Sequence, residues 1–281
     1  MSSPASPHPS PSRIAFIGGG NMARSLIGAL IRAGTRADAI AVAEPNADLR
    51  AALARDFDVP THEHARDAAR GADVLLLAVK PQVLKSVCEN IADVVADVRP
   101  LVISIAAGIR IEQLRDWLGN ELPIVRSMPN TPALIGAGAT GLFANDAASA
   151  EQRAQAEAIL GSAGSTVWID HEDLMDTVTA LSGSGPAYFF LLVEALEDAA
   201  VAQGLPRATA RALAKQTCLG AGRMLVEDGE PPTVLRERVT SPGGTTAAAL
   251  DVFANGGLRD LVASAIEAAT RRGRELSEKY S

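Results

Sequence analysis

The 281-residue chain is predicted to be an α/β protein, with a Rossmann-type, doubly wound and mainly parallel sheet followed by an all-α domain. Up to about Asp170, short apolar runs alternate with helical patterns, which is typical of parallel βα units. A glycine-rich turn joins the first run to the first helical pattern, and beyond Asp170 helical patterns dominate. We therefore expect a disordered tail (1–12), a Rossmann-type domain (13–170) and a helical domain (171–281).

Composition limits the possible classes of protein. A hydrophobic fraction of 47% supplies two ordinary cores, and a net charge of −7 without a basic block argues against nucleic acid or an anionic membrane as partner. The Ser- and Pro-rich residues 2–12 have no apolar run, so we expect neither order nor a signal peptide there. The most apolar stretch, 187–193, is too short to span a bilayer, which favours a cytoplasmic protein. We expect Cys88 and Cys218 to be free buried thiols, and we expect no metal site.

The first strand, turn and helix carry the clearest motif. An apolar run beginning at Ile14 predicts a buried strand, and from Met22 onward the apolar positions follow helical spacing. Gly18, Gly20 and Ala23 fit G-x-G-x-x-G/A, in which the small residues permit a tight turn, close approach of a pyrophosphate and helix packing. The free amides of the helix start then face the phosphates. This context favours a dinucleotide site over a plain βα turn.

The remaining elements of the first part continue the alternation. We expect strands at 40–43, 59–61, 73–79, 101–105 and 123–128, and helices at about 48–55 and 111–118. Two edge strands, 140–144 and 166–169, are predicted to flank a helix at about 149–160. Because parallel sheets bind ligands at the carboxyl ends of their strands, the small-residue and proline segments after these strands are expected to line the site.

The second part is predicted to be helical throughout. The expected helices span 173–181, 186–203, 207–227, 234–239, 245–254 and 258–279. Residues 187–193 are apolar on every side, and one small bundle cannot bury such a helix by itself. We therefore expect a homo-oligomer that forms through the C-terminal helices.

Two glycine loops interrupt these helices. The loop 181–188 has two alternative interpretations: a kink that lets helices cross closely, or backbone at the mouth of the nucleotide cleft. The loop 240–246 has successive backbone amides before a helix and the hydroxyls of Ser241, Thr245 and Thr246, which suits a carboxylate or phosphate. Its alternative is an ordinary capped helix start after a turn.

Six motifs, in this order and spacing, resemble those of the pyrroline-5-carboxylate reductase family. They are IGGGNMA (17–23), AVKPQ (78–82), SIAAG (104–108), MPNTP (128–132), LSGSGPAY (181–188) and SPGGTT (241–246). The resemblance covers the chain from Arg13 to about Leu276. It implies reduction of 1-pyrroline-5-carboxylate to proline with a nicotinamide cofactor, the last step of proline biosynthesis. It also implies a Rossmann domain and a helical domain that interleaves with a second subunit, some members forming decamers.

The same resemblance assigns the site residues. The residues that would line the pyrophosphate are Gly18, Gly20, Asn21 and Met22. Those along the ribose side would be Ala78, Val79, Lys80 and Pro81. Those near the nicotinamide would be Ala106, Ala107, Gly108 and Asn130. The substrate carboxylate would be held by Ser241, Gly243, Gly244 and Thr245. Thr246 would place its hydroxyl at the ring nitrogen, and we expect it to be the most important side chain for the chemical step.

The residues themselves agree with such a reaction. Hydride transfer to a C=N bond needs neither a protein nucleophile nor a metal, because the cofactor carries the chemistry and the protein positions and polarises the substrate. His62 and His64 are expected at the surface, since zinc would need further ligands, and His171 is expected at a solvated helix start.

The sequence gives two opposite indications of cofactor choice. Glu44 ends the second strand 24 residues after Gly20, where an acid binds the ribose 2′-hydroxyl of NAD and repels the 2′-phosphate of NADP. Many relatives carry a small polar residue there and favour NADPH, and Ala65 stands where some have asparagine. Arg50 could still reach a phosphate. We therefore expect NADPH or NADH, and we include Glu44 among the cofactor-binding residues.

Two alternatives remain at this stage. Another two-domain dehydrogenase would be expected to carry a lysine base in its second domain, where Lys215 is the only lysine before Lys279 and no motif marks it. A nucleotide sensor or a structural dimer without catalysis would have no need of the loop 241–246.

Overall fold

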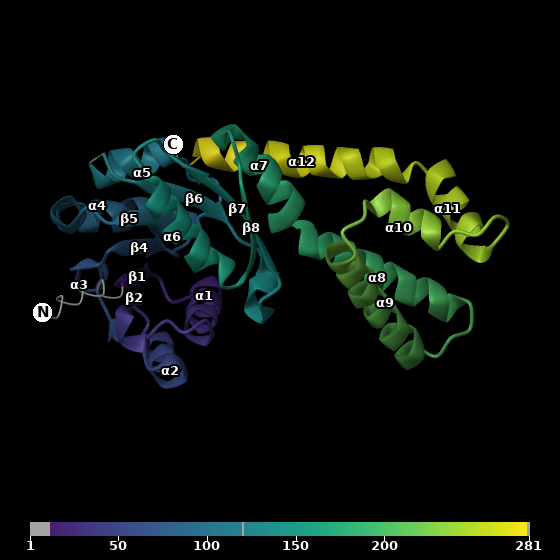
Figure 1. Ribbon diagram of the computed structural model, residues 1–281, viewed down its shortest axis with the longest axis horizontal. Helices are drawn as coiled ribbons and strands as arrows, with labels where there is room; N and C mark the ends of the chain where they lie inside the picture. Colours follow the sequence, from purple (N-terminus) through teal and green to yellow (C-terminus); the bar gives the residue numbers. More distant parts are fainter. Residues whose placement is uncertain (1–11, 120, 280–281) are drawn as a thin grey trace, which may run out of the picture. The chain divides into compact units, whose positions relative to one another are not determined.

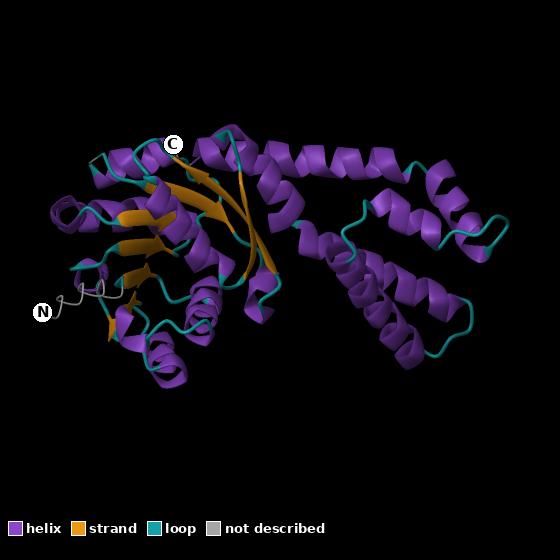
Figure 2. Ribbon diagram, viewed as in Figure 1, coloured by secondary structure: helices purple, strands orange, loops and turns teal. Residues whose placement is uncertain are grey.

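The computed structural model describes residues 12–119 and 121–279, so residues 1–11 of the predicted disordered tail (1–12) lie outside the described residues. Ser12 is described, and its Oγ accepts a hydrogen bond from Gln155 Nε2 at 3.0 Å, so the tail ends before it. The described chain contains an eight-stranded sheet in the order β3-β2-β1-β4-β5-β6-β7-β8 (Figures 1 and 2). The strands are β1 (Ile14–Ile17), β2 (Ile40–Ala43), β3 (Thr61–His62), β4 (Val74–Leu77), β5 (Leu101–Ser104), β6 (Ile124–Met128), β7 (Gly138–Ala144) and β8 (Gly164–Trp168).

The order and direction of the strands confirm the predicted doubly wound sheet. β1 pairs in parallel with both β2 and β4, so the strand order reverses beside β1, where such sheets bind their ligands. β6 and β7 are antiparallel, and β8 is parallel to β7. The prediction of two edge strands was therefore wrong for β7: β7 pairs on both sides, and only β8 lies at that edge.

Helices cover both faces of this sheet (Figure 1). Alternate residues of each strand point to opposite faces, so Phe16 packs in one core and Ile17 in the other. The first core includes side chains of α1 (Asn21–Arg32), α2 (Ala47–Phe57) and α6 (Ala150–Gly161). The second includes side chains of α3 (Ala65–Ala69), α4 (Pro81–Val98) and α5 (Ile111–Leu118). Both faces are thus buried, as a parallel sheet requires.

The segment that leaves the sheet differs from the predicted helix 173–181. A 3₁₀ turn at Glu172–Leu174 leads into α7 (Met175–Val178), and Thr179–Gly183 forms a π-helical turn before α8 (Gly185–Ala202). Ser184 precedes α8, so the glycine loop bends the chain without an extended break. A β-carbon on Gly183 would lie 2.6 Å from Met128 Cε, so this glycine permits close packing of the bend on β6, a strand, and not on a crossing helix as the first interpretation expected.

The chain divides into two compact units. The first contains the described residues up to Gly183 and those from Thr270 onward, and the second contains Ser184–Ala269. This division differs from the expected boundary at 170, because the segment after β8 and the last turns of α12 pack on the first unit. Asp176, for example, lies beside Gly273, and Val178 lies against Gly141 of β7.

The second unit consists of helices. They are α8, α9 (Arg207–Glu227), α10 (Pro232–Arg238), α11 (Thr245–Asn255) and the first part of α12 (Leu258–Lys279). Its described residues include few buried side chains, among them Ala210 and Leu235, whereas Phe189 and Phe190 of α8 are exposed. No described helix combines the length and apolar character needed to cross a membrane.

Cys88 is buried on α4 as predicted, whereas Cys218 is only half-buried on α9 because the second unit has little core of its own. Burial raises the pKa of the Cys88 thiol to about 12. Since the thiolate is the reactive form, we expect Cys88 to resist iodoacetamide at neutral pH in the native protein and to react after unfolding. Peptide mapping of the alkylated protein measures this, and rapid labelling of native Cys88 would contradict it.

Candidate active site

The glycine turn after β1 has the geometry that a dinucleotide requires. Gly18 has a φ of +103°, and a β-carbon there would lie 2.7 Å from the carbonyl oxygen of Ala78, so only glycine fits. Gly20 precedes the first residue of α1, and a β-carbon at Gly20 would meet nothing within 4 Å. The turn therefore packs tightly on the end of β4 while leaving open space at the helix start. That space and the free first-turn amides fit a pyrophosphate.

Glu44 is fixed at the end of β2 by two backbone amides. Its Oε2 accepts a hydrogen bond from Gly19 N at 2.9 Å, and its Oε1 accepts one from Asn46 N at 2.9 Å. The residue is only 8% exposed. Arg50 lies beside it, because Arg50 Nη1 donates to the carbonyl oxygens of Glu44 and Pro45 at 2.8 and 2.9 Å. An acid and a guanidinium thus flank the expected position of the adenosine ribose.

The carboxyl end of β4 lies beside the glycine turn. Ala78 N donates to the carbonyl oxygen of Ile17 at 2.8 Å, which ties the end of β4 to the glycine turn. Ala78 and Val79 are half-buried, Lys80 is exposed and Pro81 begins α4. The structure therefore brings the predicted residues of the glycine turn, β2 and β4 to one edge.

After β5, the loop of residues 106–110 leads into α5 and is largely buried. Ala106 is 4% exposed, Gly108 and Ile109 are also buried, and Ala107 is half-buried. Gly108 has a φ of +74°, and a β-carbon there would lie 3.5 Å from Ser277 N in the last turns of α12. The loop is therefore held between the sheet and α12.

Asn130 uses both ends of its amide within the protein. Its Nδ2 donates to the carbonyl oxygen of Ser182 at 2.9 Å, and its Oδ1 accepts from Ala139 N at 2.9 Å. The side chain thus joins the end of β6 to β7 and to the π-helical turn. Its bonds hold backbone in place, which differs from a side chain directed at a cofactor.

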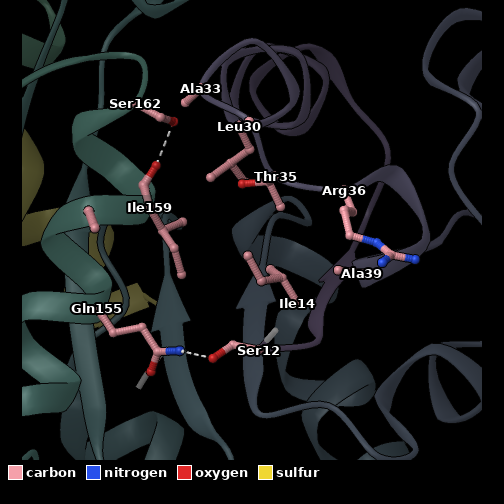
Figure 3. Close-up of a pocket in the computed structure, with 12 residues that line it drawn as sticks. Ser12, Ile14, Leu30, Ala33, Thr35, Arg36, Ala39, Gln155, Ile159 and Ser162 are labelled. Atoms are coloured by element: carbon pink, nitrogen blue, oxygen red, sulfur yellow. Dashed lines mark hydrogen bonds between the residues drawn. The ribbon is translucent and has the colours of Figure 1, made fainter. Parts of the chain in front are cut away.

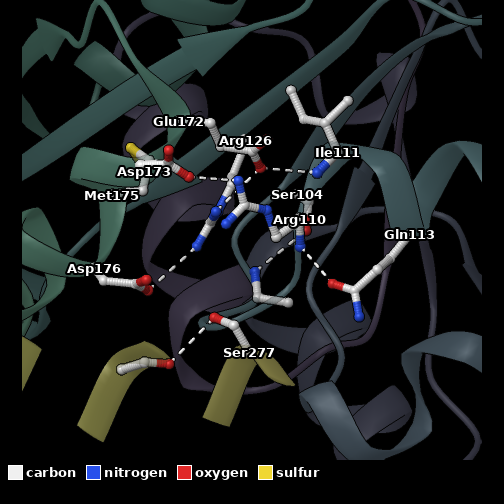
Figure 4. A network of polar contacts seen from close by, with 12 residues as sticks. Ser104, Arg110, Ile111, Gln113, Arg126, Glu172, Asp173, Met175, Asp176 and Ser277 are labelled. Carbon is white, nitrogen blue, oxygen red and sulfur yellow. Dashed lines mark hydrogen bonds and ion pairs between the residues drawn. The ribbon is translucent and has the colours of Figure 1, made fainter. Parts of the chain in front are cut away.

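An ionic network joins the end of the loop 106–110 and β6 to residues 172–176 (Figure 4). Arg126 of β6 is 3% exposed, and its guanidinium contacts Glu172 Oε1 at 3.0 Å and Asp176 Oδ1 at 3.7 Å. Arg110 Nη2 contacts Asp173 Oδ1 at 2.5 Å. This pair lowers the pKa of the exposed Asp173 carboxyl, chiefly through the hydrogen bond from Arg110.

A cavity of about 510 Å³ lies at the amino-terminal end of β1, away from the carboxyl ends of the strands (Figure 3). Ile14, the first residue of β1, lines it together with Leu30 near the end of α1 and Ile159 of α6. Because ligands of such sheets bind at the carboxyl ends of the strands, this cavity is not the cofactor site.

In the second unit, residues 241–246 form a tight turn and a helix start. Gly244 N donates to the carbonyl oxygen of Ser241 at 3.0 Å, and Gly243 has a φ of +70°. Gly244 precedes α11 and has no side chain that could cap an amide. The first-turn amides of a helix have no intrahelical partners, so these amides remain uncapped by Gly244. Ser241 and Thr245 are exposed, and Thr246 is half-buried. The turn therefore presents amides and hydroxyls suited to an anion.

Comparison with known proteins identifies the family. Residues 13–108 match the model described as NADP oxidoreductase, coenzyme F420-dependent, and residues 172–276 match pyrroline-5-carboxylate reductase dimerisation. The pyrroline-5-carboxylate reductase of Pseudomonas aeruginosa is 48% identical over 95% of this chain and 97% of the relative. The chain belongs to the pyrroline-5-carboxylate reductase family. The family predicted from the six motifs is thereby confirmed.

Structures of pyrroline-5-carboxylate reductases have the same fold. The one from Coxiella burnetii is 44% identical, with a TM-score of 0.92 over 95% of this chain and 99% of that one. The one from Plasmodium falciparum, solved with NADP bound, is 30% identical, with a TM-score of 0.82 over 95% and 98% of the two chains. The present chain is accordingly an oxidoreductase that uses NAD(P)H, as predicted.

The sequence did not reveal the network around Arg126. Arg126 stands within an apolar strand, and Glu172 and Asp173 follow His171 in what was expected to be a solvated helix start. The one available signal was the arginine itself, because a guanidinium inside a buried strand needs an acidic partner.

Proposed function

We propose that this chain carries out the reaction for which its family is named: reduction of the C=N bond of 1-pyrroline-5-carboxylate to L-proline, the last step of proline biosynthesis. The observation that carries the proposal is the turn of residues 241–246 before α11. Its amides and hydroxyls suit a small substrate that has a carboxylate beside a ring nitrogen.

The chemistry requires two contacts from the protein. When bound, the nicotinamide cofactor supplies the hydride, which adds to the carbon of the C=N bond while the nitrogen gains a proton. We assign the substrate carboxylate to Ser241, Gly243, Gly244 and Thr245. The hydroxyl of Thr246 hydrogen-bonds the ring nitrogen and so fixes the orientation of the C=N bond.

For the cofactor, we assign the pyrophosphate to the turn and helix start. The assigned residues are Gly18, Gly20, Asn21 and Met22; the ribose side is assigned to Glu44, Ala78, Val79, Lys80 and Pro81; and the nicotinamide is assigned to Ala106, Ala107 and Gly108. Asn130 acts beside them by holding backbone, in line with its two bonds to Ser182 and Ala139.

The protein works as a homo-oligomer in this proposal. The dimerisation match and the exposed apolar side chains of α8 support a homodimer formed through the C-terminal helices. We extend this to further assembly of the dimers into decamers in the cytoplasm, as in some relatives. Sedimentation at several protein concentrations measures the assembly, and a stable monomer would contradict it.

The test is oxidation of NADPH and of NADH, followed separately, with 1-pyrroline-5-carboxylate as substrate and proline identified as product. Turnover to proline supports the proposal. Folded protein that binds the cofactor but leaves this imine unreduced would overturn it.

Glu44 is proposed to set the preference between the two cofactors. A carboxylate at this position favours a ribose hydroxyl over a phosphate, whereas Arg50 beside it favours the phosphate. We expect Glu44→Ser to raise the ratio of kcat/KM for NADPH to that for NADH by about tenfold, because a like-charge repulsion is removed. Steady-state kinetics with both cofactors measure the ratio.

Two further variants separate charge from structure. Glu44→Gln keeps an oxygen for the Gly19 amide without the charge, so it should move the ratio in the same direction. Asp48→Asn removes an equal charge from an exposed position of α2 and should leave the ratio unchanged. An unaltered ratio in both Glu44 variants would refute this role.

A further inference from the structure

Glu172 connects its own segment to α5 and β6, through residues that lie 61 and 46 positions earlier in the sequence. Its Oε1 accepts a hydrogen bond from Ile111 N at 2.8 Å and one from Arg126 Nη1 at 3.0 Å. Ile111 is the first residue of α5, whose first-turn amides need partners from outside the helix. The carboxylate therefore caps α5 from another segment and is itself neutralised by a buried guanidinium (Figure 4).

The capped residue directly follows the loop 106–110. At its start this loop is tied to the sheet, since Ile105 N donates to the carbonyl oxygen of Leu77 at 3.2 Å. At its centre, Gly108 lies against Ser277. At its end, Arg110 bonds Gln113 and pairs with Asp173, and Ile111 N donates to Glu172. Glu172 is the one of these partners that also pairs with the buried Arg126, so it ties this end of the loop to β6.

The loop 106–110 follows β5, where the nicotinamide half of the cofactor is expected. In doubly wound sheets the pyrophosphate lies at the turn after the first strand and the adenosine ribose at the acid after the second. Here those positions are Gly18–Gly20 and Glu44. The remaining half of the dinucleotide consequently extends from β1 toward β4 and β5, where the loop 106–110 follows β5.

We propose that Glu172 is a positioning residue for the nicotinamide: by capping α5 and pairing with Arg126, it holds the loop 106–110 against the reacting half of the cofactor. The proposal rests on the assignment of Ala106, Ala107 and Gly108 to the nicotinamide. It requires no contact between Glu172 and substrate or cofactor.

The experiment compares binding of whole and truncated cofactor. In Glu172→Ala, the dissociation constant of NADPH or NADH, whichever the wild type prefers, should rise about tenfold, because a displaced loop misplaces the nicotinamide. The dissociation constant of ADP-ribose, or of its 2′-phosphate if NADPH is preferred, should remain unchanged, because that fragment lacks the nicotinamide. Glu172→Gln, which keeps an acceptor for Ile111 N, should recover part of the affinity. Glu112→Gln removes the charge of an exposed acid in the first turn of α5 and should change neither constant.

The two dissociation constants together distinguish a positioning role of Glu172 from a general structural role. Selective weakening of the whole cofactor supports the proposal, and equal weakening of both ligands with a lower melting temperature would show a general structural role and overturn it. Unchanged binding of both ligands also overturns it. Because these are binding measurements, failure of the wild type to reduce 1-pyrroline-5-carboxylate would refute the proposed reaction and leave this test intact.

Discussion

Arg126→Met is expected to lower the free energy of unfolding by about 3–5 kcal/mol, since breaking a buried ion pair leaves uncompensated charge in the interior. The side chain of Arg126 is 4% exposed, and those of its partners Glu172 and Asp176 are 16% and 7% exposed. Methionine fills much of the volume of the arginine stem but offers these carboxylates no donor. Urea unfolding of wild type and variant measures the loss. The slope of the unfolding free energy against urea concentration is compared between the two proteins.

The pair of Arg110 and Asp173 provides a matched control in the same network. The side chains are 40% and 79% exposed, so water can solvate either charge when its partner is removed. Arg110→Met should therefore cost less than about 1 kcal/mol. Similar losses in the two arginine variants would contradict the idea that burial makes Arg126 critical.

Most of the sheet was predictable because local pattern and tertiary role coincide in it. The strands beginning at Ile40, Val74 and Leu101 are continuous apolar runs, as burial on both faces demands. The five-residue α3 escaped prediction because it is shorter than the window in which helical periodicity becomes visible. β7 was placed at an edge because its pattern records burial but not which strands pair with it.

The candidate site was predictable to the extent that its motifs are local. The turn at Gly18 and the acid at Glu44 follow from spacing, and both lie at the same edge of the sheet. What spacing could not give is the partner of each polar group. The bond from Gly19 N to Glu44, and the two bonds that occupy Asn130, depend on segments 25, 52 and 9 residues away. Glu172 was unpredictable for the same reason.

Thr246→Ala is expected to reduce kcat by about tenfold to a hundredfold, because one hydrogen bond to the reacting group contributes about 1–3 kcal/mol. Thr246 is the second residue of α11, within the turn and helix start assigned to the substrate. Its hydroxyl is assigned to the ring nitrogen, where protonation accompanies hydride addition. The carboxylate contacts come from other residues, so KM for 1-pyrroline-5-carboxylate should change less than kcat. Steady-state kinetics at saturating cofactor measure both constants.

The choice of replacement shows whether the hydroxyl itself is responsible. Thr246→Ser keeps the hydroxyl and should retain most of the turnover, whereas Thr246→Val keeps the shape without the hydroxyl and should resemble alanine. A turnover that follows side-chain volume instead, with valine active and serine impaired, would mean that Thr246 acts by packing in the first turn of α11. Wild-type turnover in the alanine, serine and valine variants alike would remove Thr246 from the chemical step and leave the substrate nitrogen to another donor.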